Sequence, residues 1–284
     1  MPYADDMLCI RIVRDVQVNR ICPSSLHFLS YIHTAVRNWE RRQYVRNTWA
    51  RIADQHEYRF RIVFFIGKVD LNESEESRLR QEMAEYEDIV QLSFVEHYRN
   101  LTMKGLAAMS WIEKNCAHIK YVVKTDDDVF VNVPRLSRTL RLHFRRHPGN
   151  PPPILCRVMH GSPVFRARGK WIVTRGEYAG DFYPDYCSGL GFLLDMRTLV
   201  KLIGVALRTK YFWVDDVHFT GIIREAAKIK IGDLTPVFQY YGSPKYQVAR
   251  SRLTELRKEF IHLDWQTEFT NDKDVMTFSI GKRW

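Results

Sequence analysis

The sequence lacks a long apolar run, an internal repeat and any low-complexity segment. No stretch approaches the roughly 20 apolar residues that cross a bilayer. Residues 1–23 mix charged side chains into their apolar positions, so we interpret them as neither a signal peptide nor an anchor. We therefore expect either a soluble protein or a membrane anchor upstream of this sequence. A hydrophobic content of 45% and an aromatic content of 13% indicate an ordinary globular chain.

Cysteine is also scarce, and no two cysteines form a C-x-x-C pair, which removes support for zinc-binding and thioredoxin-like classes. Five cysteines are too few for a domain built on disulfides, and an odd number leaves at least one outside an intrachain pair. One or two disulfides in an oxidising compartment remain compatible with the sequence. Two sequons would accept glycans only in the secretory pathway; they begin at Asn72 and Asn100.

Positive charge is abundant: the formal net charge is +10 and the pI is about 9.4. A basic surface attracts polyanions, which include nucleic acids, anionic lipids and phosphorylated small molecules. A nucleic-acid-binding protein is one alternative, but the sequence contains no RRM, KH or zinc-finger pattern. The 284 residues fit one large domain or two small ones.

Short apolar runs alternate with amphipathic stretches, which is typical of an α/β domain. Asn72 followed by Glu75 resembles a capping box at a helix start. The patterns predict strands at residues 26–36, 61–67, 121–123, 171–174 and 191–194. They predict helices at residues 39–53, 72–86, 101–116, 134–143 and 216–228. Residues 148–153 are rich in proline and predict a surface loop between two halves of one domain.

The acidic triplet Asp126-Asp127-Asp128 directly follows an apolar strand. Residues two apart on an extended chain point the same way, so Asp126 and Asp128 are expected to face one site. Adjacent carboxylates repel one another unless a cation or an arginine neutralises them. Oxygen ligands of this kind, with phosphate oxygens, hold Mg²⁺ or Mn²⁺. A solvated acidic turn is the alternative, but α/β sheets place ligands at strand ends, which favours a metal and diphosphate site.

A second acidic pair, Asp215-Asp216, follows Trp213 at a predicted helix start. A carboxylate there could serve as a general base that deprotonates a hydroxyl nucleophile, or simply as a helix N-cap. Arg41, Arg42 and Arg46 lie close together early in the chain and are suited to phosphate, or form a solvated helix face.

Histidine offers a further candidate ligand, His262, which lies between apolar residues. It could be a third metal ligand, or it could be packed in a core.

Six segments, in order, resemble the β-1,3-glycosyltransferase family, which includes β-1,3-galactosyl- and N-acetylglucosaminyltransferases, and the resemblance covers residues 26–262. Residues 42–49 resemble its R-x-x-I-R-x-T-W opening, and residues 63–67 its F-x-x-G strand. Residues 82–104 are similar to its E-x-x-x-Y-x-D-I … D-x-Y-x-N-L-T-x-K stretch. The metal motif is closely matched by KTDDDV (residues 124–129). Residues 170–191 are close to the segment K-W-x-V … Y-P-x-Y-C-S-G-x-G, and DDVHFTG (residues 215–221) is similar to E-D-V-x-x-G.

The chain departs from these patterns in a few places. Asp215 replaces the usual Glu, and Ser93 and Glu96 stand where the family usually carries Asp, so that turn is expected to bind less or nothing. The family's members are Golgi proteins with one N-terminal membrane anchor, and none lies within this sequence. We expect a missing upstream segment, with a naturally soluble variant as the alternative.

The resemblance implies an α/β fold of the GT-A type, a Rossmann-like nucleotide-sugar-binding domain with a mixed central sheet flanked by helices. Residues 1–25 would be a stem remnant or N-terminal extension, 26–270 the catalytic domain and 271–284 a tail. The implied reaction is inverting transfer of galactose or N-acetylglucosamine, in β-1,3 linkage, from UDP-galactose or UDP-GlcNAc to a glycan on a glycoprotein or glycolipid. A catalytically inactive relative that acts as a chaperone is an alternative, although both acidic pairs are present.

The resemblance also implies roles for individual residues. Asp126 and Asp128, with His262, would hold Mn²⁺ (or Mg²⁺), and Asp216 would be the catalytic base. Residues expected to contact the nucleotide or order its pocket are Arg42, Arg46, Lys124, Asp126 and Asp127, although Asp127 could do no more than shape the turn. Residues expected to contact the donor or acceptor sugars are Trp171, Tyr183, Tyr186, Trp213 and Asp215, although the aromatic ones could instead belong to the core. In a Golgi lumen a Cys116–Cys187 disulfide is expected, although sequence does not determine connectivity.

Overall fold

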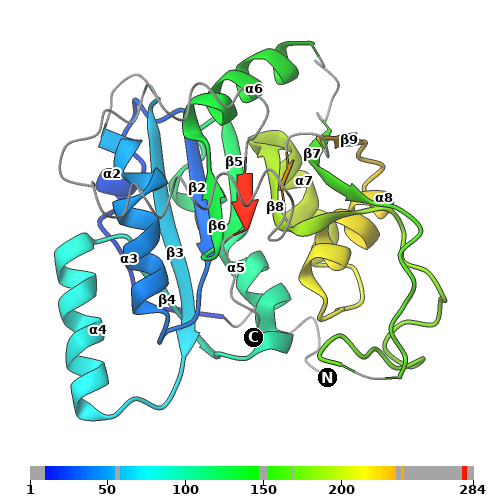
Figure 1. The fold of residues 1–284 in the computed structure, drawn as a ribbon, viewed down its shortest axis with the longest axis horizontal. Coiled ribbons are helices and arrows are strands. Elements are labelled where there is room, and N and C mark those ends of the chain that lie inside the picture. Colours follow the sequence, from blue (N-terminus) through cyan, green and yellow to red (C-terminus); the bar gives the residue numbers. More distant parts are fainter. Residues whose placement is uncertain are drawn as a thin grey trace.

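The apolar, β-branched runs of the sequence form one mixed sheet, with strands in the order β1-β4-β3-β2-β5-β8-β7-β9 (Figure 1). The structure is a computed structural model that describes residues 10–54, 58–146, 153–167, 169–234, 238–239 and 277–279. The strands of this sheet are β1 (Ile12–Arg14), β2 (Phe28–His33), β3 (Phe60–Lys68), β4 (Ile89–Val95), β5 (Tyr121–Asp126), β7 (Ile154–Met159), β8 (Tyr186–Asp195) and β9 (Ile231–Asp233). A smaller sheet joins β6 (Val129–Val131) to β11 (Thr277–Ser279) and β10 (Phe238–Gln239).

Strand order determines where a ligand can bind. Strands β4, β3, β2 and β5 are parallel, whereas β8 is antiparallel to β5. The chain runs from β2 outward through β3 and β4, and then returns to place β5 on the other side of β2. Ligands of open α/β sheets bind at such a switch in strand order, beside the carboxyl ends of the strands. In this protein that place lies at His33 and Asp126, which are register partners.

Helices cover both faces of the sheet, because successive side chains of each strand point to opposite faces. The helices are α2 (Val18–Ile21), α3 (Trp39–Asn47), α4 (Glu73–Tyr86), α5 (Leu101–Asn115), α6 (Val133–Arg146), α7 (Met196–Ala206) and α8 (Arg224–Ala226). Short 3-10 segments η1 (Trp49–Asp54) and η2 (Tyr98–Asn100) and the π-helix η3 (Val217–Ile223) complete the set. Along β2, Leu29 and Tyr31 join the core under α5 and α7, whereas Phe28 and Ile32 join the core under α3 and α6.

The predicted α/β class, with a mixed sheet flanked by helices, is confirmed. The capping box is confirmed too: the Glu75 N–H donates to the Asn72 side chain at 2.9 Å, and the Asn72 N–H donates to the Glu75 carboxylate at 3.1 Å. The strand predicted at residues 171–174 is wrong. The Thr174 carbonyl instead accepts from the N–H groups of Glu177 and Tyr178, so the chain closes a local turn there.

The predicted Cys116–Cys187 disulfide is also wrong. Cys116, at the end of α5, pairs with Cys22, and Cys187 on β8 pairs with Cys156 on the neighbouring strand β7. Each pair has its Cα atoms 5.5 Å apart. The topology explains this result, because β7 and β8 bring residues 156 and 187 side by side, whereas Cys116 lies beyond the far end of α5.

Segments near both ends of the chain pair with strands of the folded domain. Within the predicted N-terminal extension, β1 pairs with β4 and Cys22 is disulfide-bonded. Residues 277–279 of the predicted tail pair with β6. Most of the predicted 148–153 loop, and His262, lie outside the described residues. None of the described helices is long and apolar enough to cross a lipid bilayer.

Candidate functional site

The acidic turn is held in place by its middle residue. Asp127 is buried, and its carboxylate accepts hydrogen bonds from Thr34 at 2.6 Å, Asn38 at 2.7 Å and Arg41 at 2.9 Å. These three donors come from the segment that leaves β2 and enters α3. Of the two roles predicted for Asp127, the structure favours shaping the turn, because protein donors already reach both of its oxygens.

Asp126 and Asp128 keep partly exposed carboxylates on either side of that turn, with side-chain exposures of 41% and 24%. The chain turns after Asp126, so the extended-strand reason for a shared direction does not apply. They nevertheless interact: burial, with the charges of Asp128 and Asp215, raises the pKa of Asp126 to about 6 against the opposing effect of Lys124. Burial and the Asp127 charge raise the pKa of Asp128.

These carboxylates fit a divalent cation by their chemistry. A nearby cation favours the ionised form of carboxylates whose pKa is raised by burial and by like charge. Among the residues the structure describes, no three His, Cys, Asp or Glu side chains form a ready metal cluster. Two carboxylates with phosphate oxygens are nevertheless a common way to hold Mg²⁺.

Lys124 links the two acidic pairs. Its ammonium is buried, lies 2.7 Å from an Asp126 oxygen and donates to the Gly189 carbonyl at 3.1 Å. An Asp215 oxygen lies 3.8 Å away. Burial alone would lower the pKa of Lys124, but the charges of Asp126 and Asp215 outweigh it and raise that pKa. Lys124 is therefore a permanent cation where β5, β8 and the acidic pair meet.

Asp216 begins the helical segment that continues as η3. Its carboxylate accepts the Val217 N–H at 2.8 Å, so it is an N-cap as well as a candidate base. Burial, followed by the charge of Asp215, raises the pKa of Asp216 to about 7. Its second oxygen lies 3.4 Å from where a Cβ on Gly189 would stand, so the glycine keeps that side of the carboxylate open. The neighbouring Asp215 carboxylate lies 3.8 Å from His33 at the end of β2.

Arg42 and Arg46 belong to a different environment. Arg42 is completely buried and donates to the Glu82 carboxylate and to the carbonyls of Ala35 and Val36. Arg46 pairs with Glu82 and Asp88. Protein acceptors thus surround both guanidinium groups, which favours their predicted role of ordering the pocket over contact with a nucleotide. The arginine that does reach the acidic turn is Arg41.

The aromatic residues predicted to bind sugars differ in exposure. Trp213 is buried, with the Arg99 guanidinium 4.3 Å from its ring centroid. Tyr186 packs edge-on against Tyr183, with ring centroids 6.1 Å apart. Trp171 is 48% exposed and donates its indole N–H to the Tyr98 hydroxyl at 2.7 Å.

Two features of the site were not predicted from sequence. Tyr98 is 43% exposed and packs edge-on against Trp213, with ring centroids 6.2 Å apart, and burial together with the charges of Asp215 and Asp216 raises its pKa to about 12. Glu96, where weak binding was expected, accepts hydrogen bonds from the Gly67 N–H at 2.7 Å and from Lys104 at 2.6 Å. Lys104 also donates to the Thr34 carbonyl at 2.7 Å, so the Lys104–Glu96 ion pair stabilises the loop after β2.

Comparisons with known proteins give a consistent result. The profile of the family described as Galactosyltransferase matches residues 40–235. Beta-1,3-galactosyltransferase 1 of mouse and of human is 29% identical over 206 residues, which covers 69% of this chain and 60% of the relative. Mouse beta-1,3-galactosyltransferase 5 is 30% identical over 213 residues, which covers 74% of this chain and 67% of the relative. The matched part therefore spans about three-fifths of the type 1 relatives.

Likeness to solved structures is more distant. The bifunctional glycosyltransferase WbbM gives a TM-score of 0.45 at 16% identity, covering 93% of this chain and 47% of that one. Mouse xyloside xylosyltransferase 1 gives a TM-score of 0.40 at 10% identity, covering 89% and 97%. Scores of this size support no functional inference.

Proposed function

This chain belongs to the galactosyltransferase family, and from that premise we propose that it is an inverting glycosyltransferase. It moves galactose or N-acetylglucosamine from UDP-galactose or UDP-GlcNAc to a glycan hydroxyl in β-1,3 linkage. The observation that carries the proposal is the convergence of two acidic pairs on one buried lysine. Lys124 lies between Asp126 and Asp215 where the strand order switches, which is where an α/β sheet binds a nucleotide.

Asp126 and Asp128 are the residues that would hold Mn²⁺ or Mg²⁺ in this proposal. A divalent ion there supplies positive charge to the diphosphate of the leaving group. His262, the third predicted ligand, lies outside the described residues. Lys124 keeps Asp126 in place, and Asp127 keeps the turn in shape through its three hydrogen bonds.

Asp216 is the proposed general base. In an inverting transfer it takes the proton from the acceptor hydroxyl as that oxygen bonds to the anomeric carbon and the bond to the diphosphate breaks. Such assistance contributes about 10²- to 10⁴-fold in rate. A pKa of about 7 suits the task, because the carboxylate is then basic enough to accept a proton near neutral pH yet largely ionised above it.

The acceptor side of the site is proposed to lie along Tyr98 and Trp171. Both rings are exposed, joined by a hydrogen bond, and Tyr98 packs against Trp213, which lies two residues before Asp215. Amphipathic rings of this kind suit ligands that are apolar on one face and polar at the edge, as sugars are. The two disulfides suit an oxidising compartment, and we propose the lumenal face of the Golgi membrane.

The base assignment is tested with Asp216→Asn. UDP binding should survive and transfer should fall by at least about 10²-fold, because the amide cannot accept the proton. Asp195→Asn is a matched control: Asp195 also caps a helix, with its carboxylate accepting the Arg197 N–H at 2.9 Å, but it lies at the far end of β8. Transfer that persists in Asp216→Asn at near wild-type rate would show that Asp216 is not the base.

The cation assignment is tested with Asp128→Ala. UDP release measured over a Mn²⁺ titration should need a much higher ion concentration, or stop, when this ligand is lost. Metal-dependent release with an unchanged titration midpoint would show that Asp128 is not a ligand. The same assay on wild-type protein addresses the chaperone alternative, which predicts no UDP release with any donor or acceptor.

A further inference from the structure

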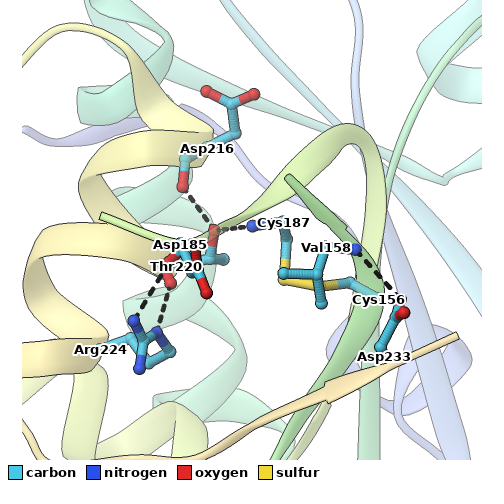
Figure 2. Close-up of a disulfide and its surroundings, with 8 residues drawn as sticks. All are labelled: Cys156, Val158, Asp185, Cys187, Asp216, Thr220, Arg224 and Asp233. Carbon is cyan, nitrogen blue, oxygen red and sulfur yellow. Dashed lines mark hydrogen bonds between the residues drawn. A yellow bond between two sulfur atoms is a disulfide. The ribbon is translucent and has the colours of Figure 1, made fainter. Parts of the chain in front are cut away.

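The backbone of Asp216 is tied to the sheet through one hydroxyl. The Thr220 Oγ1 lies 2.5 Å from the Asp216 carbonyl oxygen and 2.8 Å from the Cys187 nitrogen (Figure 2). The Cys187 N–H can only donate, so the hydroxyl accepts from it and gives its single proton to the Asp216 carbonyl. Thr220 itself is completely buried. The hydroxyl therefore bridges the helix turn that begins at Asp216 to strand β8.

Strand β8, which carries Cys187, is held in place by a disulfide. Cys187 is disulfide-bonded to Cys156 on β7, and both cysteines are completely buried (Figure 2). Arg224 adds a second link between the same elements, donating to the Thr220 carbonyl at 2.8 Å and to the Asp185 carbonyl at 3.1 Å. Gly221 permits the close approach: a Cβ there would lie 3.1 Å from Pro184 and 3.3 Å from Tyr186.

The helix is widened at this place. Residues 217–223 form a π-helix, in which hydrogen bonds join residues five apart, and such widened turns occur often at functional sites. DDVHFTG has one residue more between its acidic pair and its glycine than the E-D-V-x-x-G pattern that it resembles. A helix accommodates one extra residue by widening a turn. We infer that the extra residue keeps Gly221 against β8 while Thr220 reaches both Asp216 and Cys187.

We propose that Thr220 is a positioning residue that sets the place of the Asp216 carboxylate relative to the acceptor hydroxyl. The inference rests on the proposed function, in which Asp216 is the base. Displacing a catalytic group by about 1 Å costs roughly 10²-fold in rate. Loss of the bridge should therefore lower kcat and leave the donor KM unchanged, because the donor contacts lie on the acidic turn rather than on η3.

The test is Thr220→Val, which removes the hydroxyl and keeps the shape, beside Thr220→Ser, which keeps the hydroxyl. We expect Thr220→Val to lower kcat roughly 10- to 100-fold, and Thr220→Ser to stay within about threefold of wild type. Thr48→Val is the matched control, because Thr48 is another buried threonine, at the end of α3, whose hydroxyl donates to a carbonyl four residues back, at 2.7 Å, far from Asp216. Thr48→Val should lower the melting temperature without changing kcat. If Thr220→Val does not fold, Thr220→Ala, which also lacks the hydroxyl, replaces it.

The outcomes separate this inference from the function beneath it. A folded Thr220→Val or Thr220→Ala with kcat within about threefold of wild type overturns the positioning role, and so does a Thr220→Ser as slow as Thr220→Val. If Asp216→Asn abolishes transfer in the same assay, only the positioning inference has then failed. If Asp216→Asn retains transfer, the base assignment fails and the inference fails with it.

Discussion

Replacing Glu82 by glutamine should destabilise the protein strongly and leave donor affinity unchanged. Glu82 on α4 accepts two hydrogen bonds from Arg42, at 2.8 and 2.6 Å, and one from Arg46 at 2.7 Å. The side chain of Arg42 has no exposed surface, and that of Glu82 is only 10% exposed. The substitution therefore leaves a buried guanidinium without its anion.

The expected loss of stability depends on the hydrogen-bond partners that each arginine retains in Glu82→Gln. Breaking a buried ion pair by removing one partner costs about 3–5 kcal/mol. Arg46 still has Asp88, and Arg42 still donates to two backbone carbonyls, so we expect the lower end, about 3 kcal/mol. For a domain of this size that corresponds to a fall in melting temperature of roughly 5–10 °C.

The pH dependence has a definite sign. Burial alone would raise the pKa of Glu82, but the hydrogen bonds and charges of Arg42 and Arg46 outweigh it and hold that pKa below its ordinary value of 4.5. A lowered carboxyl pKa gives stability that is complete above the unfolded-state pKa and lost as pH falls through the folded-state pKa. Wild type and Glu82→Gln should therefore differ at neutral pH and converge only as the pH falls through the lowered folded-state pKa of Glu82.

The assay combines urea unfolding with UDP binding. Glu76→Gln is the control on the same helix, because Glu76 pairs with Arg14 and with the exposed Arg80 and should contribute only about 0–1 kcal/mol. If Glu82→Gln weakened UDP binding tenfold or more while its unfolding curve matched wild type, the reasoning would be refuted and the arginines would be nucleotide ligands.

Two further predictions concern the surface and the disulfides. Trp171→Ala should raise the acceptor KM roughly tenfold and leave the donor KM unchanged. Phe182→Ala, which removes another exposed ring, should change neither KM. A change confined to the donor KM would contradict the acceptor role of Trp171. Cys22→Ser should lower the free energy of unfolding by about 4–5 kcal/mol, because it opens a loop with a sequence separation of 94. Cys9→Ser should have no such effect, since Cys9 belongs to neither the Cys22–Cys116 nor the Cys156–Cys187 pair. A loss below about 1 kcal/mol in Cys22→Ser would contradict the pairing.

Features that depend on neighbouring residues were predictable from the sequence. The strand 60–68 is a β-branched and aromatic run, and the helix at Asn72 has its cap three residues from its partner Glu75. The acidic turn followed from position as well as composition, because carboxylates at the end of a buried strand lie where α/β sheets bind ligands.

Features that depend on distant partners were not predictable. Arg42 and Arg46 have the composition of a phosphate site, but their acids, Glu82 and Asp88, lie about 40 positions further along the chain. The disulfides likewise depend on which strands are neighbours. In the sequence, the π-helix is indicated only by one extra residue in DDVHFTG. The role of that residue becomes clear only from the structure, where the Thr220 hydroxyl accepts the Cys187 N–H.

Electrostatics at the site explain why the overall charge of +10 could not by itself indicate a nucleotide. Lys124 interacts with the carboxylates of Asp126, Asp215 and Asp216. Arg41 is shared between Asp127 and Asp128 on the acidic turn. Carboxylates thus outnumber the cations that face them, and a diphosphate approaching this turn would meet net negative charge. Burial is the largest cause of the raised pKa values of Asp126 and Asp128, and the neighbouring carboxylates add to it. A basic surface can gather an anionic donor near the protein, and in the proposed function a divalent cation between these carboxylates and the phosphates would offset the negative charge that the donor meets.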